Sequence, residues 1–345
     1  MANIMKVGII GASGYTGQEL VNLLIRHPKI DLSMVTSRAH AGNPLSSVVP
    51  KLGHKGHLIS FVNPVLPELV QSDIELFFLA LPHGTASEYA IALLDAGKKI
   101  IDLSADFRLN SPTLYKEFYG TDHPAPQWLP VAQYGLPELH PVSWQKSPLI
   151  ASPGCYPTSI LVPLAPLLRD KLIDEKEIIV HSISGISGAG KNASERLLFC
   201  ERNESAGAYG LPKHRHLSEI EEQLSEFAGQ SITLSFHPHL APMNRGLCST
   251  ISVRPKSSLA ESKIRQCWEN TYSNRPFVQV LSQGQFPETG SVVGTNRIDI
   301  SVSEDARMNR YILCSAEDNL LKGAGGQAVQ TMNLCNGYAE DCGLV

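Results

Sequence analysis

The chain has 345 residues, of which 43% are hydrophobic and 18% are charged. This composition is typical of a folded chain with a sizeable core and excludes a disordered one, and the length allows one to three domains. A formal net charge of -4, without any basic block, argues against a nucleic-acid partner.

Strand-like and helix-like segments alternate through residues 1–150. Strands are predicted at 6–10, 32–37, 74–79 and 99–103, and helices at 14–27 and 85–96, the second closed by Gly97. Strands that are buried on both faces and separated by helices form a parallel sheet with helices on each side. The sequence therefore predicts an α/β fold whose N-terminal part is a doubly wound parallel sheet of the Rossmann type.

The pattern changes after Asp106. Residues 112–148, rich in Pro, Tyr and His, predict a long irregular connection, and 155–172 predict a helix. The remainder predicts strands at 178–184, 232–237, 247–254, 297–302 and 310–316, and helices at 217–228, 258–273 and 319–336. This is typical of an α+β domain with a mostly antiparallel sheet.

The seven cysteines are odd in number and widely spaced, and no Cys-x-x-Cys motif occurs. Neither a metal site nor a disulfide framework is therefore indicated, and a reduced, cytoplasmic compartment is the simplest interpretation. The apolar run 74–81 is much shorter than the roughly 20 residues that a membrane helix needs. The first residues do not fit a signal peptide. We expect a cytoplasmic protein that binds no membrane.

A glycine loop connects the first predicted strand to the first helix. Glycines at this turn allow a pyrophosphate to approach the N–H groups of the helix N-terminus. The spacing G-x-x-G-x-x-G is a variant of the dinucleotide-binding fingerprint, and its place between strand and helix favours a bound cofactor over a simple turn. The expected contacts are Gly11, Ser13, Gly14, Tyr15, Thr16 and Gly17.

The second predicted strand ends in Ser37 and Arg38, where an NAD enzyme would carry an acidic residue for the ribose hydroxyls. A serine and an arginine can instead bind a 2′-phosphate, which points to NADP. The alternative is that Arg38 is an ordinary surface charge.

Cys155 lies within Ser-Pro-Gly-Cys-Tyr-Pro-Thr, directly before a predicted apolar helix. Pro157 suits the first turn of a helix, so Cys155 falls where the helix N-terminus favours a thiolate. Such a thiolate can attack an acyl carbon, and the neighbouring N–H groups can stabilise the oxyanion. A buried structural cysteine is the alternative, which we accept for the other six.

A thiol nucleophile needs an acid or base and a group that orients it. His214 and His216, followed by Glu219, supply two imidazoles and a carboxylate just before a helix, and His237 and His239 form a second pair. Each of these histidines is as readily explained by packing or surface exposure.

Arg108 follows the fourth predicted strand, at the sheet edge where ligands bind in this architecture, and it could bind a substrate carboxylate. A surface ion pair is the alternative. The run 185–192 imitates a P-loop but has Asn192 where Mg²⁺ coordination needs Ser or Thr. We expect this loop to present N–H groups and Lys191 to a phosphate, with Lys191 at the substrate and Ser187 and Gly188 at the cofactor.

Taken in order, these motifs resemble those of the N-acetyl-γ-glutamyl-phosphate reductase family. This family acts in arginine biosynthesis and is related to aspartate-semialdehyde dehydrogenase. The shared segments are the glycine loop 11–17, 104–108, 152–158, 184–188, 214–219, 239–246 and 318–323. The resemblance spans almost the whole chain. Its most specific segment is Pro-Gly-Cys-Tyr-Pro-Thr, since the aspartate-semialdehyde enzymes typically carry Asn-Cys-x-Thr.

This resemblance implies an NADPH-dependent reduction of N-acetyl-L-glutamyl 5-phosphate through a thioester. It places the nucleophile on Cys155 and the catalytic histidine on His214 or His216, with His214 favoured. It makes Arg108 and Glu219 substrate-orienting residues and brings Asn319 to the nicotinamide. It also implies homodimers or homotetramers, an NADP-binding domain of 1–154 plus 318–345, and a catalytic, oligomerising domain of 155–317, which resembles the C-terminal domain of glyceraldehyde-3-phosphate dehydrogenase.

Three other functions stay open at this point. One alternative substrate is an acyl phosphate that is one methylene longer, as in lysine biosynthesis. A binding pocket discriminates between two substrates that differ by one methylene by only about 1–3 kcal/mol. Aspartate semialdehyde is a second alternative substrate. A catalytically silent NADP-binding sensor would retain the fold without a reactive Cys155, whereas a cysteine hydrolase would have no use for the glycine loop.

Overall fold

The structure, a computed structural model, describes residues 4–257 and 259–345. The chain divides into two compact units. The first comprises the described residues up to Lys116 together with Gly120–Pro153 and Ala324–Val345, and the second comprises Glu117–Tyr119 and Gly154–Gly323. Asp318 and Asn319 therefore belong to the second unit, whereas the sequence placed the return to the first domain at residue 318.

A parallel sheet with the strand order β3-β2-β1-β4-β5-β7-β6 forms the centre of the first unit. Its strands are β1 (Met5–Ile10), β2 (Ile30–Thr36), β3 (Phe61–Val62), β4 (Leu76–Leu79), β5 (Lys99–Asp102), β6 (Gln133–Tyr134) and β7 (Leu149–Ala151). The strand order reverses between β1 and β4, which leaves a crevice at their carboxyl ends where ligands bind in such sheets. The predicted doubly wound sheet is confirmed.

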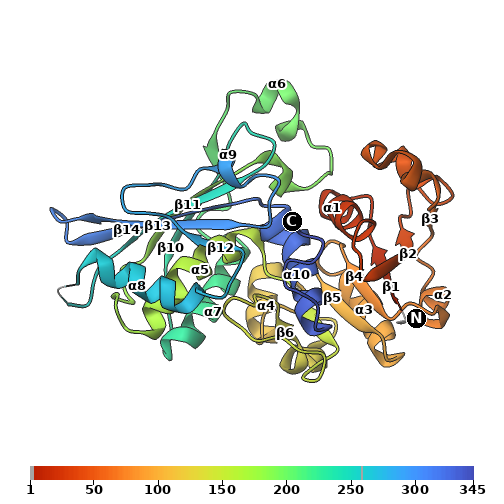
Figure 1. Cartoon of the computed structure of the whole chain (residues 1–345), viewed down its shortest axis with the longest axis horizontal. Coiled ribbons are helices and arrows are strands. Elements are labelled where there is room, and N and C mark those ends of the chain that lie inside the picture. The colour runs from red at the N-terminus through yellow and green to blue at the C-terminus, as the bar shows by residue number, and fades with distance from the viewer. Residues whose placement is uncertain (1–3, 258) are drawn as a thin grey trace. The chain divides into compact units, whose positions relative to one another are not determined.

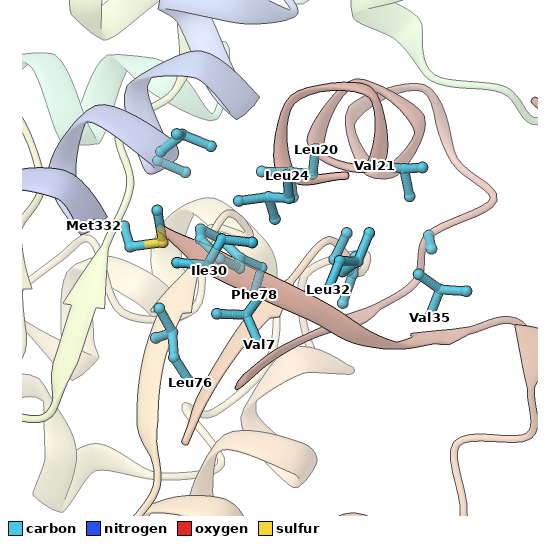
Figure 2. Packing of buried hydrophobic residues seen from close by; sticks show 14 of the residues in the cluster. Val7, Leu20, Val21, Leu24, Ile30, Leu32, Val35, Leu76, Phe78 and Met332 are labelled. Atoms are coloured by element: carbon cyan, nitrogen blue, oxygen red, sulfur yellow. The ribbon is translucent and has the colours of Figure 1, made fainter. Parts of the chain in front are cut away.

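Alternate side chains of these strands enter two separate hydrophobic layers. Val7, Leu76 and Phe78 pack beneath α1 (Tyr15–Leu24) and α10 (Gly326–Cys335), as Figure 2 shows around Leu24 and Met332. Phe77 and Leu79 face α2 (Leu66–Gln71) and α3 (Ala86–Asp95) on the opposite side. Because both faces are covered, the strands read as continuous apolar runs, and this is why their sequence pattern was recognisable.

The second unit contains a mixed sheet with the order β12-β13-β14-β11-β8-β10-β9 (Figure 1). Its strands are β8 (Ile179–Ser184), β9 (Gly207–Ala208), β10 (Ser235–Leu240), β11 (Leu247–Val253), β12 (Val278–Val280), β13 (Ile298–Asp305) and β14 (Arg310–Glu317). Most neighbouring pairs are antiparallel, and only β8–β10 and β12–β13 are parallel. The predicted mostly antiparallel α+β architecture is confirmed.

The helices of this unit are α5 (Cys155–Arg169), α6 (Phe199–Arg202), α7 (His216–Ala228), α8 (Glu261–Tyr272) and α9 (Thr289–Val292). Helix α5 packs against β11, β14, α7 and α8, and its residues 156–168 are all buried. Ser258, with which the sequence prediction began α8, lies outside the described residues.

Two prolines lie inside α5, and side chains from other elements compensate for the hydrogen bonds that they remove. Pro163 cannot donate to the carbonyl of Ser159, and the Ser315 hydroxyl donates to that oxygen at 2.7 Å. Pro166 likewise cannot donate to the carbonyl of Val162, and this oxygen accepts a hydrogen bond from the Tyr272 hydroxyl at 2.6 Å. The helix that carries Cys155 at its start thus remains continuous because the sheet and α8 satisfy its carbonyl groups.

The segment 112–148, predicted as irregular, contains ordered elements. It forms α4 (Pro112–Tyr119), a 3₁₀ segment η3 (Pro126–Val131) and the short β6. Ser111 caps α4 by accepting a hydrogen bond from the Leu114 N–H at 3.2 Å. The Ser-Pro pair at this cap is a sequence signal for a helix start that the prediction overlooked.

Two other elements differ in extent from their predictions. Strand β10 begins at Ser235 rather than 232, because the N–H groups of Ile232 and Leu234 are bound by side chains of α7. The predicted helix 319–336 is divided into a π-helical turn at Leu321–Gly325, labelled η6, and α10. The Asp318 carboxylate accepts hydrogen bonds from the N–H groups at 320 and 321, and a glycine-rich stretch follows.

Among the described residues, no helix is both long enough and apolar enough to span a bilayer. All seven cysteines are free thiols.

Candidate functional site

The first turn of the parallel sheet requires glycine at two positions. A Cβ added to Gly11, whose φ is +91°, would lie 2.4 Å from the carbonyl oxygen of Ala80. A Cβ added to Gly17 would lie 2.3 Å from the oxygen of Gly11. These contacts let the turn close tightly against α1, and space for a pyrophosphate remains at Gly14, where an added Cβ would meet nothing nearer than 3.9 Å. The turn therefore fits a dinucleotide.

The end of β2 lies against the same turn. The Ser37 hydroxyl donates to Ser13 Oγ at 3.0 Å, which ties the strand end to the glycine loop. Arg38 is exposed, and its Nη2 donates to the Tyr89 hydroxyl at 3.0 Å. The hydroxyl thereby holds a solvent-accessible guanidinium beside the turn, as a 2′-phosphate site requires.

Cys155 begins α5 and lines a cavity of about 340 Å³. Gly154 caps the helix in an extended conformation, so the first-turn N–H groups and the positive end of the helix dipole are located at the thiol. The rings of His214, just before α7, and His216, its first residue, line the same cavity, together with Gly188 of the 185–190 loop. The structure thus brings four predicted site residues together within one unit.

Glu219 has a different environment from the one predicted. Its side chain is buried, and Oε1 accepts a hydrogen bond from the Gly154 N–H at 2.9 Å. This bond fixes the residue that precedes Cys155 and joins the starts of α5 and α7. Glu219 is not among the residues that line the cavity. A role in orienting the substrate stays a prediction, while the observed contact positions the nucleophile.

The two histidines stack edge to face, with ring centroids 5.0 Å apart. The Nδ1 of His214 accepts a hydrogen bond from the backbone N–H of His216 at 3.1 Å, so the neutral ring carries its proton on Nε2. Burial, reinforced by the charge of Arg215, lowers the pKa of His214 to about 4. His214 is therefore neutral near pH 7 and can donate a hydrogen bond through Nε2.

This lowered pKa predicts a dependence of stability on pH. The unfolded histidine titrates near 6.5, so its neutral form favours the native state above that pH, and this contribution is lost as the pH falls towards 4. When the pH is lowered from 7.5 to 5, the free energy of unfolding should fall by about 2 kcal/mol less in His214→Asn than in wild type. Urea unfolding at the two pH values measures the difference, with the exposed His54→Asn as the control. Equal losses in all three proteins would contradict the expectation.

Arg108 lies in the first unit and bonds to the backbone. Its Nε donates to the carbonyl oxygen of Ser152 at 2.8 Å and its Nη2 to that of Leu103 at 2.9 Å. Asp102, the last residue of β5, has a pKa that is raised to about 7 by burial and by the charge of Asp106. The guanidinium thus ties the end of β5 to the end of β7, and its contact with substrate stays a prediction.

The loop at 185–191 is held by backbone and amide contacts. Gly185, Ile186 and Ser187 donate N–H hydrogen bonds to the segment 243–246. Asn319 is buried; its Oδ1 accepts from the Gly246 N–H at 2.8 Å, and its Nδ2 donates to Ser187 Oγ at 3.0 Å. Asn319 therefore joins two loops of the second unit, and its predicted contact with the nicotinamide is untested. Lys191 is exposed at the end of the loop.

Two tyrosines in the cavity were not predicted as site residues. The Tyr209 hydroxyl donates to the Tyr156 hydroxyl at 3.0 Å, and both rings stack edge to face on His214. Burial raises the pKa of Tyr209 to about 12 and that of Tyr156 further. Tyr156 belongs to the cysteine motif. No local sequence pattern marks Tyr209, which directly follows the short strand β9 and lines the cavity.

The second histidine pair lies on β10, away from the cavity lining. His237 stacks on His181 of the adjacent β8 with centroids 4.6 Å apart, and its Nε2 shares a hydrogen bond with Ser235. Within residues 4–257 and 259–345, no three His, Cys, Asp or Glu side chains converge in a way that would hold a metal ion.

Comparison with known proteins agrees with this arrangement. Two family models match the chain: the NAD binding domain of semialdehyde dehydrogenase over residues 6–147, and the semialdehyde dehydrogenase dimerisation domain over 155–319. Among solved structures, aspartate semialdehyde dehydrogenase II of Vibrio cholerae covers 96% of this chain and 98% of its own, with a TM-score of 0.73. At 16% identity, this likeness shows the fold alone.

The sequence relatives are much more similar. N-acetyl-gamma-glutamyl-phosphate reductase of Akkermansia muciniphila is 48% identical over 341 residues, which span 99% of this chain and 98% of the relative. The protein of the same name from Desulfotalea psychrophila is 47% identical over 342 residues, with the same coverage. The chain belongs to the N-acetyl-gamma-glutamyl-phosphate reductase family.

Proposed function

We propose that this chain is an oxidoreductase that converts N-acetyl-L-glutamyl 5-phosphate to N-acetyl-L-glutamate 5-semialdehyde and phosphate, with NADPH as the reductant, in arginine biosynthesis. The observation that carries the proposal is the cavity in which Cys155, at the mouth of α5, faces the paired rings of His214 and His216. The 44–48% identity to relatives named for this activity supports the substrate assignment.

The first chemical step belongs to Cys155. Its thiolate attacks the acyl carbon, the C–S bond forms, and the bond from that carbon to the phosphate oxygen breaks, so that a thioester remains on the enzyme. Phosphate leaves readily, and the step needs little beyond position and thiolate character. The N–H groups of the first turn of α5 stabilise the negative charge on the acyl oxygen.

NADPH, when bound, supplies the hydride that reduces the thioester carbonyl. His214 donates an Nε2–H hydrogen bond to the oxygen of that carbon, on which the alkoxide charge develops. When the thiohemiacetal alkoxide collapses, the C=O bond forms again, the C–S bond breaks, and the aldehyde leaves the regenerated thiolate. A neutral His214 suits this role because its Nδ1 is already engaged by the His216 N–H. His216 itself, buried at the start of α7, supports the ring.

The cofactor would be held by the glycine turn, with Gly11, Ser13, Gly14, Tyr15, Thr16 and Gly17 around the pyrophosphate and Ser37 and Arg38 around the 2′-phosphate. Ser187, Gly188 and Asn319 are assigned to its nicotinamide end. Arg108, Glu219 and Lys191 are assigned to the substrate, Lys191 to its phosphate. Of these, Glu219 also fixes Gly154 through a hydrogen bond.

The preference for NADP gives a separate prediction. Arg38→Ala should raise the KM for NADP about tenfold or more, since a charge-assisted hydrogen bond is worth about 1.5–3 kcal/mol, and should leave the KM for NAD unchanged. Tyr89→Phe removes only the hydroxyl that holds Arg38 and should cost less. Initial rates with both cofactors measure this, and wild type using NAD as well as NADP would show that Arg38 does not select the cofactor.

The decisive assay runs the reaction in reverse. We expect N-acetylglutamate semialdehyde to reduce NADP in the presence of phosphate and only then, and we expect no such reduction by Cys155→Ala. Wild type that accepts aspartate semialdehyde or the one-carbon-longer acetylaminoadipate semialdehyde in its place would overturn the substrate assignment. Binding of NADP without any reaction would favour a silent sensor.

We further propose that the enzyme is a cytoplasmic homodimer or homotetramer. Its seven free thiols suit a reducing compartment. The mixed sheet carries one face that α5, α7 and α8 leave open, with Ile183 of β8 43% exposed, and such a face suits a symmetric contact between copies. Light scattering coupled to size-exclusion chromatography distinguishes these states from a monomer.

A further inference from the structure

A fully buried carboxylate that the proposed mechanism does not use lies at the end of β14. Glu317 is 0% exposed. Charged side chains are almost never buried to this degree unless they are paired, because removal of a charge from water is costly. Lys322, on the turn that follows, is also 0% exposed. This turn is π-helical, a rare conformation that is frequently found at functional sites.

The carboxylate lies next to the nucleophile. A Cβ added to Gly323 would be 2.7 Å from the Cβ of Cys155 and 2.7 Å from Oε1 of Glu317. The Cβ of Cys155 and Oε1 of Glu317 are therefore both 2.7 Å from the same position, and the distance between these two atoms is at most twice that value. Glycine at position 323 leaves the space that lets the thiol-bearing carbon and the carboxylate approach each other.

His214, one of the two imidazoles that line the cavity, is poorly suited to take the thiol proton. The Nδ1 of His214 accepts the N–H of His216, so its neutral ring presents a proton on Nε2 and no free lone pair. The other nearby carboxylate, Glu219, uses Oε1 to accept the N–H of Gly154. The cavity thus supplies a hydrogen-bond donor for the alkoxide, and Glu317 is a buried carboxylate close to the Cβ of Cys155.

We infer that Glu317 accepts the proton of Cys155 when the thiol ionises. The S–H bond breaks, an O–H bond forms on the carboxylate, and the electron pair stays on sulfur as the thiolate at the mouth of α5. Glu317 is then a proton acceptor that acts on the sulfur of Cys155 and not on the substrate. The inference rests on the proposed function in that Cys155 is the nucleophile, and it adds the acceptor that the first step needs.

A shared proton gives a distinctive dependence of thiol reactivity on pH. The pair titrates as a unit, so alkylation of Cys155 in wild type should rise in two steps with a plateau between them. The probe is iodoacetamide, and mass spectrometry of the peptide that contains Cys155 separates it from the other thiols. A single step in wild type would overturn the inference, and this measurement needs no variant.

Glu317→Gln keeps the shape of the side chain and removes the acceptor. Its Cys155 should titrate in one step and react about tenfold more slowly than wild type near pH 5.5, the change that one pKa unit produces. Asp299→Asn is the matched control, since Asp299 is a buried acid on the neighbouring β13 that pairs with Arg297. Asp299→Asn should keep the wild-type two-step profile.

The outcomes are distinguishable. A Glu317→Gln protein that reacts faster than wild type would show that the carboxylate only repels the thiolate, and an unchanged profile would show a purely structural role; either result overturns the inference. The alkylation assay needs neither NADP nor acyl phosphate. If the reverse reaction fails while the two-step profile persists, the proposed substrate is wrong and the Glu317–Cys155 pair stands.

Discussion

Cys155→Ala should lower the rate of phosphate-dependent NADP reduction by at least about 10⁴-fold, because no other group in the cavity can form the thioester. Binding of NADP should be unchanged, since the glycine turn and Arg38 belong to the other compact unit. Stopped-flow rates together with a fluorescence titration of NADPH separate the two effects.

The matched control is Cys248→Ala, a partly buried thiol on β11 whose pKa burial raises. It should keep nearly full activity. More than about one hundredth of the wild-type rate in Cys155→Ala would mean that hydride reaches the acyl group without a covalent intermediate, and the mechanism proposed above would then be wrong.

Gly323→Ala should have the second largest effect. The new methyl group would lie 2.7 Å from the Cβ of Cys155 and 3.2 Å from its Cα, and these atoms belong to the rigid start of α5. The nucleophile must therefore shift, and a displacement of about 1 Å at a reacting group can cost about 100-fold in kcat. Overpacking should also lower the free energy of unfolding by about 1–3 kcal/mol.

Steady-state kinetics and urea unfolding of the same preparation measure both changes. Gly290→Ala is the control, because a Cβ at that position meets nothing within 4 Å and its backbone needs no left-handed conformation. Wild-type kcat in Gly323→Ala would show that the approach of η6 to Cys155 does not matter for catalysis.

The elements that local pattern predicted best are those whose burial leaves a periodic trace. Residues 76–79 of β4 are all buried and read as an unbroken apolar run, and α1 and α3 carry their apolar positions at helical spacing. The glycine turn was recognisable for a related reason, since only glycine tolerates the approach of Ala80 to Gly11. Each of these features depends on neighbours in sequence or on burial from both sides.

The elements that were missed or displaced depend on distant partners. Strand β10 is displaced by three residues from its predicted start, because Ser225 and Glu221 bind the N–H groups of the residues before it. Strands β3, β6, β7 and β12 are too short to show a period, and they exist because a longer strand pairs with them. In the final helix, the carboxylate of Asp318 and the glycines after it produced a π-helical turn that helical spacing alone does not predict.

The amino-acid sequence by itself determined the two fold classes and the cofactor turn, because they depend on burial patterns and on glycines at a strand end. It also predicted Cys155 as the reactive group from the proline and cysteine at a helix start, while the resemblance to a known family assigned the catalytic histidine to the His214–His216 pair. Only the tertiary structure decided which groups surround the sulfur. Glu219 bonds to the residue before Cys155, Tyr209 lines the same cavity, and Glu317 lies near the Cβ of Cys155. This convergence follows from strand order and helix packing, which bring together residues far apart along the chain.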